Sequence, residues 1–538
     1  MYQKILFYFF LTFFISGCGS YNNIKHLPSV VGDISDDSSL YNEIVTLKKV
    51  YVTLPVPNKA KCTPWDDQTG PERPCTFDDI NHDLYANDNY RPYLEAIVDS
   101  DTFHTNIENA KFKMRGNYTR LAPQKGYGIK FFSKTDLPFG TRKLNLNKHW
   151  ADRSRMKNKL AMDLMRDIPN ITSLRTQFYN LFIDSQDYGL FTHVEALSQE
   201  YITDRGWNKN DNLYNANIFS FNEDPFLAVD PKSCQPVYPN EFNLRVEIKN
   251  GTNHCKFQEM LHAVNSNMPI DQVIEKYFNR KNYLTWLAIE IILGNKDTFY
   301  HNFALYNPIN SDTFYFVPWD YDGAWSEKQY LGKFEYSIGV WWPDPLHRKF
   351  LSIKKNREDL DAMVYKIRNQ YITDIKMKNL IDKYMPIVSE FVSKEPDSQY
   401  DNLNYMKESA NNLISLIQDN NLKLYEDEKG VPMPFDVSYD GETHTLHWTE
   451  SVDFEKDPIV YDLTISKDLN MSNPILVRKN MSSLQYNLGS DTFSAGTYYA
   501  QVIAKERDHP SYYQLAYIPA KKDADGNNYW GILEFEYK

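Results

Sequence analysis

The stretch "GNKDTFYHN" (residues 294–302) ends an apolar helical run, and "FVPWDYDG" (residues 316–323) follows it after a short interval. Asp297 and Asn302 lie five residues apart, so that one loop can present a carboxylate and an amide to a shared point. The second stretch is an apolar strand that leads into two alternating aspartates, and alternate residues of a strand share a face. Oxygen ligands of this kind are typical of Mg²⁺ or Mn²⁺ bound to phosphates.

The order of these acids is the order found in phosphoryl transfer. In protein kinases a catalytic loop carries an Asp base and, five residues later, an Asn that binds metal, and a later loop carries a metal-binding Asp before Gly. Asp297 and Asn302 have this spacing, and Asp320 or Asp322, ahead of Gly323, supplies the later acid. "NK" replaces the usual His-Arg pair before the base. The alternative interpretation is a capping Asp297 with two ordinary loop acids.

Length and charge limit the class of protein. A chain of 538 residues is too long for one hydrophobic core, which predicts a large domain and at least one smaller one. The formal net charge of −12 argues against nucleic acid as a main partner, because phosphate neutralisation needs clustered Lys and Arg.

The first residues predict export. Lys4 precedes the apolar run "ILFYFFLTFFI" and the small residues "SG", which together form a signal peptide over residues 1–17. "ISGC" resembles the lipobox of bacterial lipoproteins, so we expect Cys18 to be lipidated and to anchor the protein to a membrane at the cell envelope, facing outward. An ordinary secretory signal is the alternative. Residues 18–42 are polar and lack periodicity, which is typical of a flexible tether.

The four remaining cysteines, an even number in an exported chain, favour two disulfides. Pairing of nearest neighbours is our prediction among the three possible connectivities: Cys62 with Cys75, and Cys234 with Cys255. A zinc site is disfavoured because the spacings are irregular and no Cys-x-x-Cys occurs.

The hydrophobic patterns predict an α+β fold with two lobes followed by a small β-sandwich. The first half alternates like strands with one early helix, and from about Tyr283 the sequence is mainly helical. We place this domain at residues 43–425, a linker at 426–434 and short strands at 435–538. The last segment resembles a fibronectin type III module, with core aromatics at Trp448 and Tyr461, and the surface partner that it could bind is not identified by the sequence.

Six segments carry a specific resemblance: "FKMRGNYTRLAPQKGYGIKF", "LNLNKHWADRSRMKNKLAMDLMR", "YGLFTHVEAL", "NLYNA", "GNKDTFYHNFALY" and "FVPWDYDGAW". In this order they resemble the CotH family, the atypical kinases related to spore coat protein H, over roughly residues 45–345. The resemblance implies a diverged protein-kinase-like fold that binds ATP with Mg²⁺ or Mn²⁺ and transfers the γ-phosphoryl group to protein hydroxyls. Asp297 then resembles the base, and Asn302, Asp320 and Asp322 the metal ligands.

The same resemblance assigns nucleotide contacts in the first lobe. The "RGNYTR" turn would replace a glycine-rich phosphate loop through Arg115, Gly116, Asn117 and Arg120. Lys130 resembles the nucleotide-contacting lysine of kinases, with Lys125 as the competitor. Two further sets are less specific. The acid partner of that lysine is at best Asp163. Contacts to the adenine base of the nucleotide could come from Glu195, Tyr214 or Phe314, each of which also suits a structural role.

The functional hypothesis is metal-dependent phosphorylation of Ser or Thr in an unidentified protein substrate. The alternative is a kinase-like surface scaffold or adhesin that binds protein or glycan without catalysis, since ATP is scarce outside the cytoplasm. No serine-hydrolase elbow, zinc-protease helix or P-loop motif is present, and a glycosidase pair has no positional support.

Overall fold

The computed structural model describes residues 32–41, 46–82, 90–116, 118–325, 341–489, 493–518, 521–523 and 526–538, without the side chains of Tyr118, Lys296, Phe299 and Glu428. The signal peptide, Cys18, most of the tether and Asn117 lie outside the described residues. Within this described part of the chain, no helix is long and apolar enough to cross a membrane.

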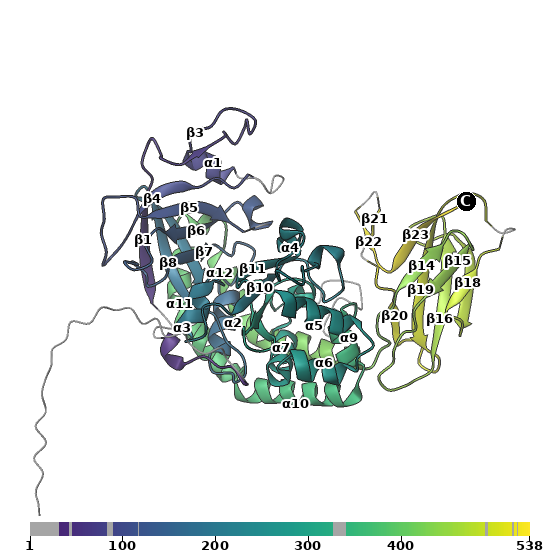
Figure 1. The fold of residues 1–538 in the computed structure, drawn as a ribbon. Helices are drawn as coiled ribbons and strands as arrows, with labels where there is room; N and C mark the ends of the chain where they lie inside the picture. The colour runs from purple at the N-terminus through teal and green to yellow at the C-terminus, as the bar shows by residue number, and fades with distance from the viewer. Residues whose placement is uncertain are drawn as a thin grey trace, which may run out of the picture.

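The first part of the chain forms a closed barrel in the strand order β1-β4-β5-β6-β7-β9-β8 (Figure 1). Its strands are β1 (Leu47–Thr53), β4 (Leu94–Ser100), β5 (Ala110–Arg115), β6 (Gly126–Phe131), β7 (Lys143–Asn147), β8 (Thr176–Ile183) and β9 (Gln186–Val194). Neighbours are antiparallel except β1 and β8, which are parallel and close the barrel. Alternate residues such as Phe112, Ile129 and Leu144 fill the interior.

Two helices lie beneath the barrel. Helix α2 (Lys157–Met165) is buried on nearly all sides, and α3 (Gln199–Asp204) follows strand β9. The apolar side of α2, including Leu160 and Leu164, belongs to the same hydrophobic cluster as the helices of the second part. This shared core joins the barrel to the rest of the domain.

The second part combines a four-stranded sheet with a group of helices. The sheet has the order β11-β10-β12-β13, and its strands are β10 (Asn212–Ala216), β11 (Val246–Asn250), β12 (Phe303–Asn307) and β13 (Tyr315–Pro318). The described α-helices are α4 (Pro239–Arg245), α5 (Cys255–Asn265), α6 (Ile270–Tyr277), α7 (Arg280–Leu293), α9 (Pro345–Leu351), α10 (Lys354–Gln370), α11 (Asp374–Val392), α12 (Leu403–Leu416) and α13 (Lys423–Lys429). Helix α7 is central, because twelve of its fourteen residues are buried.

The C-terminal part consists of β-sheets, shown in yellow in Figure 1. One sheet has the order β14-β15-β18, and the other has β17-β16-β19-β20 with β23 beside β19. The main strands are β14 (Val437–Asp440), β15 (Thr445–Trp448), β16 (Ile459–Ser466), β17 (Pro474–Met481), β18 (Gln485–Asn487), β19 (Gly496–Glu506), β20 (Tyr513–Leu515) and β23 (Ile532–Tyr537). Trp448 and Tyr461 lie in their shared core, as predicted. Residues 426–429, assigned to the linker from sequence, instead complete α13.

Both predicted disulfides are present. Cys62 pairs with Cys75 across the short strands β2 (Lys61–Cys62) and β3 (Arg73–Pro74), and Cys234 pairs with Cys255 at the start of α5. The second disulfide fastens the loop after β10 to the helical part. The nearest-neighbour pairing predicted from the sequence is confirmed.

Candidate functional site

The loop that carries Asp297 begins where α7 ends. Gly294 caps the helix in the left-handed region at φ 60°, and a Cβ there would lie 2.5 Å from Oδ1 of Asn421. A short 3₁₀ turn over Lys296–Phe299 then presents Asp297, and Asn302, at φ 60°, leads directly into β12. The carboxylate and the amide therefore flank one tight loop at the end of a buried helix.

The second acidic segment folds back onto the same helix end. After β13 the chain turns at Asp320, which has φ 56°, and the amide of Trp325 donates a hydrogen bond of 2.6 Å to the carbonyl oxygen of Leu293. Gly323 lies against the first loop so closely that a Cβ on it would be 2.4 Å from Oδ2 of Asp297. The two stretches singled out from the sequence thus meet in space.

Asp320 and Asp322 strongly influence each other. Burial and then the charge of Asp322 raise the pKa of Asp320 well above its usual range, and the charge of Asp297 adds to the shift. Burial would also raise the pKa of Asp322, but the contact with His149, whose Nδ1 lies 3.5 Å from Oδ2, lowers it. Asp297 is therefore close enough for its charge to affect Asp320.

Polar side chains from the barrel and from α2 surround the acid pair. Burial lowers the pKa of Arg115, at the end of β5, and the charges of Asp320 and Asp322 oppose this shift. The guanidinium also donates a hydrogen bond to Oδ1 of Asn147 at the end of β7. Asn158 of α2 donates to Oδ1 of Asp320 at 3.2 Å. The site is thus assembled from segments separated by as many as two hundred residues.

Lys130 does not join this site, which corrects the sequence prediction. It is exposed on β6 and is paired in register with Lys111 on β5 and Lys143 on β7. Arg115 of β5 pairs with Gly126 of β6. Lys130 lies four residues beyond Gly126 on β6, which is about 13 Å from the level of Arg115 at the usual rise of a strand. Its neighbours in register are lysines rather than the acids.

The other first-lobe candidates have mixed outcomes. Lys125 donates a hydrogen bond of 2.5 Å to the carbonyl oxygen of Arg120, whose own side chain is fully buried. Gly116 has φ 96°, and a Cβ would lie 1.9 Å from Oγ1 of Thr119, so this turn requires glycine. The charge of Arg115 interacts with both acids of the pair.

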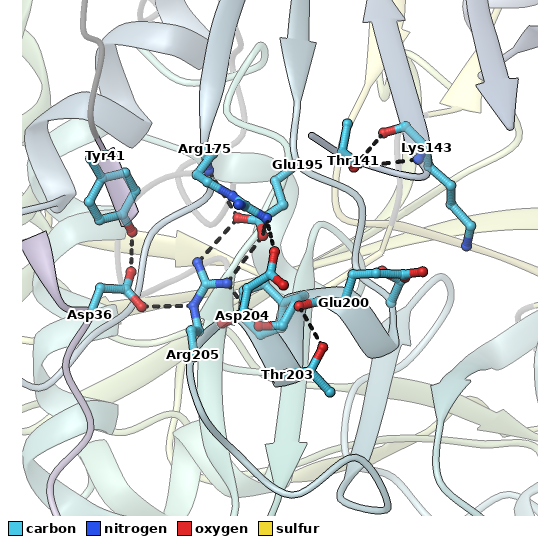
Figure 2. A network of polar contacts seen from close by, with 12 residues as sticks. Asp36, Tyr41, Thr141, Lys143, Arg175, Glu195, Glu200, Thr203, Asp204 and Arg205 are labelled. Carbon is cyan, nitrogen blue, oxygen red and sulfur yellow. Dashed lines mark hydrogen bonds and ion pairs between the residues drawn. The ribbon is translucent and has the colours of Figure 1, made fainter. Parts of the chain in front are cut away.

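Glu195 has a structural role instead of a nucleotide contact. Figure 2 shows it between two arginines: Oε1 accepts from Arg175 at 2.6 Å and Oε2 from Arg205 at 3.2 Å. Burial would raise the pKa of Glu195, but these two charges lower it to about 2. Arg205 also pairs with Asp36 at 2.7 Å. The network therefore fastens the segment before β1 to the base of the barrel.

Three further candidates are also used elsewhere. Asp163, the predicted acid partner of the nucleotide lysine, forms ion pairs with Lys159 and Arg166 of its own helix segment. Tyr214 and Phe314 lie in the hydrophobic core, where the Tyr214 hydroxyl is 2.9 Å from Nδ1 of His254. Neither aromatic ring is exposed to a ligand.

Sequence reasoning missed three polar side chains of the site, His149, Asn147 and Asn158. All three belong to the segment between β7 and the first turn of α2, far from the acids in sequence. No spacing rule connects them with Asp320 or Asp322. The one local signal is the "NKHW" run ahead of the helix, which places polar residues at the end of a strand.

The donor set suits a divalent cation that arrives with its phosphate ligands. Among the described residues, no group of three or more His, Cys, Asp and Glu side chains is arranged to hold a metal ion. Mg²⁺ is commonly held by one or two carboxylates together with substrate phosphates and water, which matches Asp320, Asp322 and the amide of Asn302. Burial and the charge of Asp322 raise the pKa of Asp320, and a bound cation would favour the ionised form of both acids.

Comparison with known proteins gives one family. A family model described as CotH kinase protein matches residues 112–423, more than half of the chain. The inner spore coat protein H of Bacillus subtilis (strain 168) is 28% identical over 216 residues, which are 39% of this chain and 57% of that protein, so the chain spans little more than half of that relative. The proinflammatory kinase CtkA of Helicobacter pylori is a solved structure with 11% identity and a TM-score of 0.23, covering 56% of this chain and 94% of that one.

Proposed function

The chain belongs to the CotH kinase protein family, and from this premise we propose that it transfers the γ-phosphoryl group of ATP to Ser or Thr of a protein substrate with Mg²⁺ or Mn²⁺. One observation carries the proposal: the carboxylate of Asp297 lies against Gly323, beside an acid pair that faces Arg115. Asp297 thus supplies a proton acceptor, the acid pair supplies oxygen ligands for a metal ion, and Arg115 supplies a positively charged side chain.

Each role follows from the chemistry of the side chain. Asp297 accepts the proton of the acceptor hydroxyl as that oxygen attacks the γ-phosphorus of ATP, while the bond from this phosphorus to the β,γ-bridging oxygen breaks and ADP leaves. Asn302 and the acid pair would hold the cation, which, when bound, neutralises charge on the phosphates. Arg115, permanently charged and held by Asn147, binds phosphate oxygens and stabilises the charge that spreads over them during transfer.

Labelled ATP tests the proposal. The purified protein, incubated with Mn²⁺ or Mg²⁺ and a mixture of envelope proteins, is expected to transfer label, and Asp297→Ala and Asp320→Ala are expected to abolish transfer. Asp382→Ala is the matched control, because that aspartate is exposed on α11 in an i,i+4 pair with Lys378. Transfer that survives both site changes would refute the assignment.

A second candidate is a kinase-like scaffold that binds a partner without catalysis. The displaced position of Lys130 and the use of Asp163 in other ion pairs favour it, because kinases rely on a lysine with an acidic partner. Thermal unfolding with ATP and Mg²⁺ separates the two, since a ligand that binds the folded state raises the melting temperature. No shift at millimolar nucleotide would favour the scaffold.

Location and the C-terminal sheets complete the proposal. A lipid on Cys18 would anchor the protein outward-facing at the cell envelope, and the C-terminal strands, in a fibronectin type III-like role, would bind a surface partner. Phe454, near those strands, packs edge-on against Trp342 of the kinase-like part, with the ring centroids 5.7 Å apart. Metabolic labelling with a fatty acid analogue, with Cys18→Ala as the control, tests the anchor.

A further inference from the structure

A buried hydrogen bond joins the turn of the acid pair to helix α7. Tyr321 lies between Asp320 and Asp322 in the sequence, and its hydroxyl donates to Oε1 of Glu290 on α7. Glu290 is 1% exposed and Tyr321 is fully buried. This side-chain pair attaches the turn that carries both acids to the central helix of the domain.

The helix end that receives Tyr321 is itself held in place. Asn421 donates a hydrogen bond of 2.9 Å from Nδ2 to the carbonyl oxygen of Ile292, and its Oδ1 fills the space beside Gly294. The amide of Trp325 donates a hydrogen bond to the carbonyl oxygen of Leu293, the last residue of the helix. Glu290 therefore presents its carboxyl from a fixed support and not from a mobile loop.

The surroundings of Glu290 favour the neutral acid. Oε2 is buried, and within the described part of the chain no hydrogen bond of good geometry reaches it, although the side chain of Asn295 lies near this carboxyl. A buried carboxylate oxygen without a partner is costly when ionised. Burial accordingly raises the pKa of Glu290 to about 8, although Tyr321 and Asn295 oppose the shift. A neutral amide of the same shape can replace such a carboxyl.

We propose that Glu290 is a positioning residue, which acts through Tyr321 to fix the geometry of Asp320 and Asp322 and thereby their affinity for a divalent cation with nucleotide. The identity of the ligand, a divalent cation with nucleotide, rests on the proposed function, whereas the positioning of the turn by Glu290 does not. Glu290 reaches the turn through its hydrogen bond to Tyr321, so its proposed effect on the cation is indirect.

Three variants of the full chain test the proposal: Glu290→Gln, Glu290→Leu and Tyr321→Phe. Hydrogen–deuterium exchange of the ligand-free protein reports the turn, in a peptide covering residues 319–325. Electron paramagnetic resonance of Mn²⁺ with a non-hydrolysable ATP analogue reports affinity. Tyr365→Phe, on an exposed face of α10, is the matched control.

We expect Tyr321→Phe and Glu290→Leu to speed exchange in the turn and to weaken Mn²⁺ binding about 10–100-fold, the usual loss when a group that orients a metal ligand is removed. Glu290→Gln is expected to retain both properties, which a general loss of packing would not predict. Should Glu290→Leu fail to fold, Tyr321→Phe still decides, because it removes one hydroxyl only.

Two results would overturn the proposal: exchange at 319–325 that is unchanged in Tyr321→Phe, or a Glu290→Gln protein that behaves like Glu290→Leu. A third result separates it from the proposed function. If exchange follows the expected pattern but the wild-type protein binds neither Mn²⁺ nor the analogue, the positioning stands and the phosphotransferase assignment fails.

Discussion

Lys148 and Asp397 form a buried ion pair between the barrel and the helical part, and its two halves should differ in their contributions to stability. Nζ of Lys148 lies 2.7 Å from Oδ1 of Asp397, and the side chains are 3% and 4% exposed. Asp397 also accepts from the amide of Leu190 at 2.9 Å and from Gln124 at 3.3 Å. Each partner can be removed without touching the acid pair.

Lys148→Met leaves a buried carboxylate with two donors but no cation. Breaking a buried pair in this way costs about 3–5 kcal/mol. Asp397→Asn should cost less, because the lysine can lose its proton. Burial already lowers the pKa of Lys148 to about 8, with Asp397 opposing the shift. At pH 7 the lysine in Asp397→Asn can lose its proton, and doing so costs only the difference between its wild-type pKa of about 8 and the pH. The extra electrostatic cost of this variant is therefore limited to about one pKa unit, about 1.4 kcal/mol.

Urea unfolding at pH 7, followed by tryptophan fluorescence, measures these differences. The double variant Lys148→Met/Asp397→Asn carries no buried charge, so it should be at least about 1 kcal/mol more stable than Lys148→Met alone. Lys394→Met, whose exposed pair with Glu390 spans one helical turn, is the control and should change stability by less than about 0.5 kcal/mol. Equal costs for the two single variants, with additive effects in the double variant, would refute the reasoning.

Three further changes have defined outcomes. Gly323→Ala should lower phosphoryl transfer strongly while leaving nucleotide binding and melting temperature nearly unchanged, because the new methyl group displaces only the carboxylate of Asp297; an active variant in the label-transfer assay would contradict this. Arg115→Ala should weaken ATP·Mn²⁺ binding in calorimetry, whereas Lys130→Ala, on the exposed outer face, should not; equal losses would place Lys130 at the nucleotide. Glu290 holds its proton up to about pH 8 in the folded state but releases it near its usual pKa of 4.5 when unfolded, so stability falls as pH rises through this window. Glu290→Gln removes this pH dependence. The free energy of unfolding of the variant minus that of wild type should therefore grow by about 3 kcal/mol from pH 5 to pH 7.5, as measured by urea unfolding. A difference that stays constant with pH would contradict a neutral buried acid.

Local sequence determined much of the site. Asp297 and Asn302 could be predicted because a single loop sets their separation, and Asp320 because an apolar strand leads directly into it. The hairpin of β8 and β9 has an equally local cause, since alternating apolar residues flank a short turn. In each case the physical cause lies within about ten residues of the feature.

Long-range contacts explain the errors. Alternation showed that Lys130 lies on the opposite face of β6 from Ile129, but not how far along the barrel the acid pair lies. The parallel pairing of β1 with β8, which closes the barrel, leaves no local signal. A nucleotide contact for Glu195 stayed open beside a structural role because no sequence pattern shows that Arg175 and Arg205, twenty and ten residues away, pair with it.

The position of Arg115 changes how the missing lysine–acid pair should be understood. In kinases a glutamate keeps the nucleotide lysine charged and oriented, and an exposed Lys130 among other lysines has no such support. A guanidinium needs none, since it stays protonated even when buried, and Asn147 fixes its direction through a hydrogen bond. Its charge interacts with those of Asp320 and Asp322 across the site. The lack of an acidic partner for Lys130 is therefore compatible with phosphate binding, because the guanidinium of Arg115 can supply the positive charge.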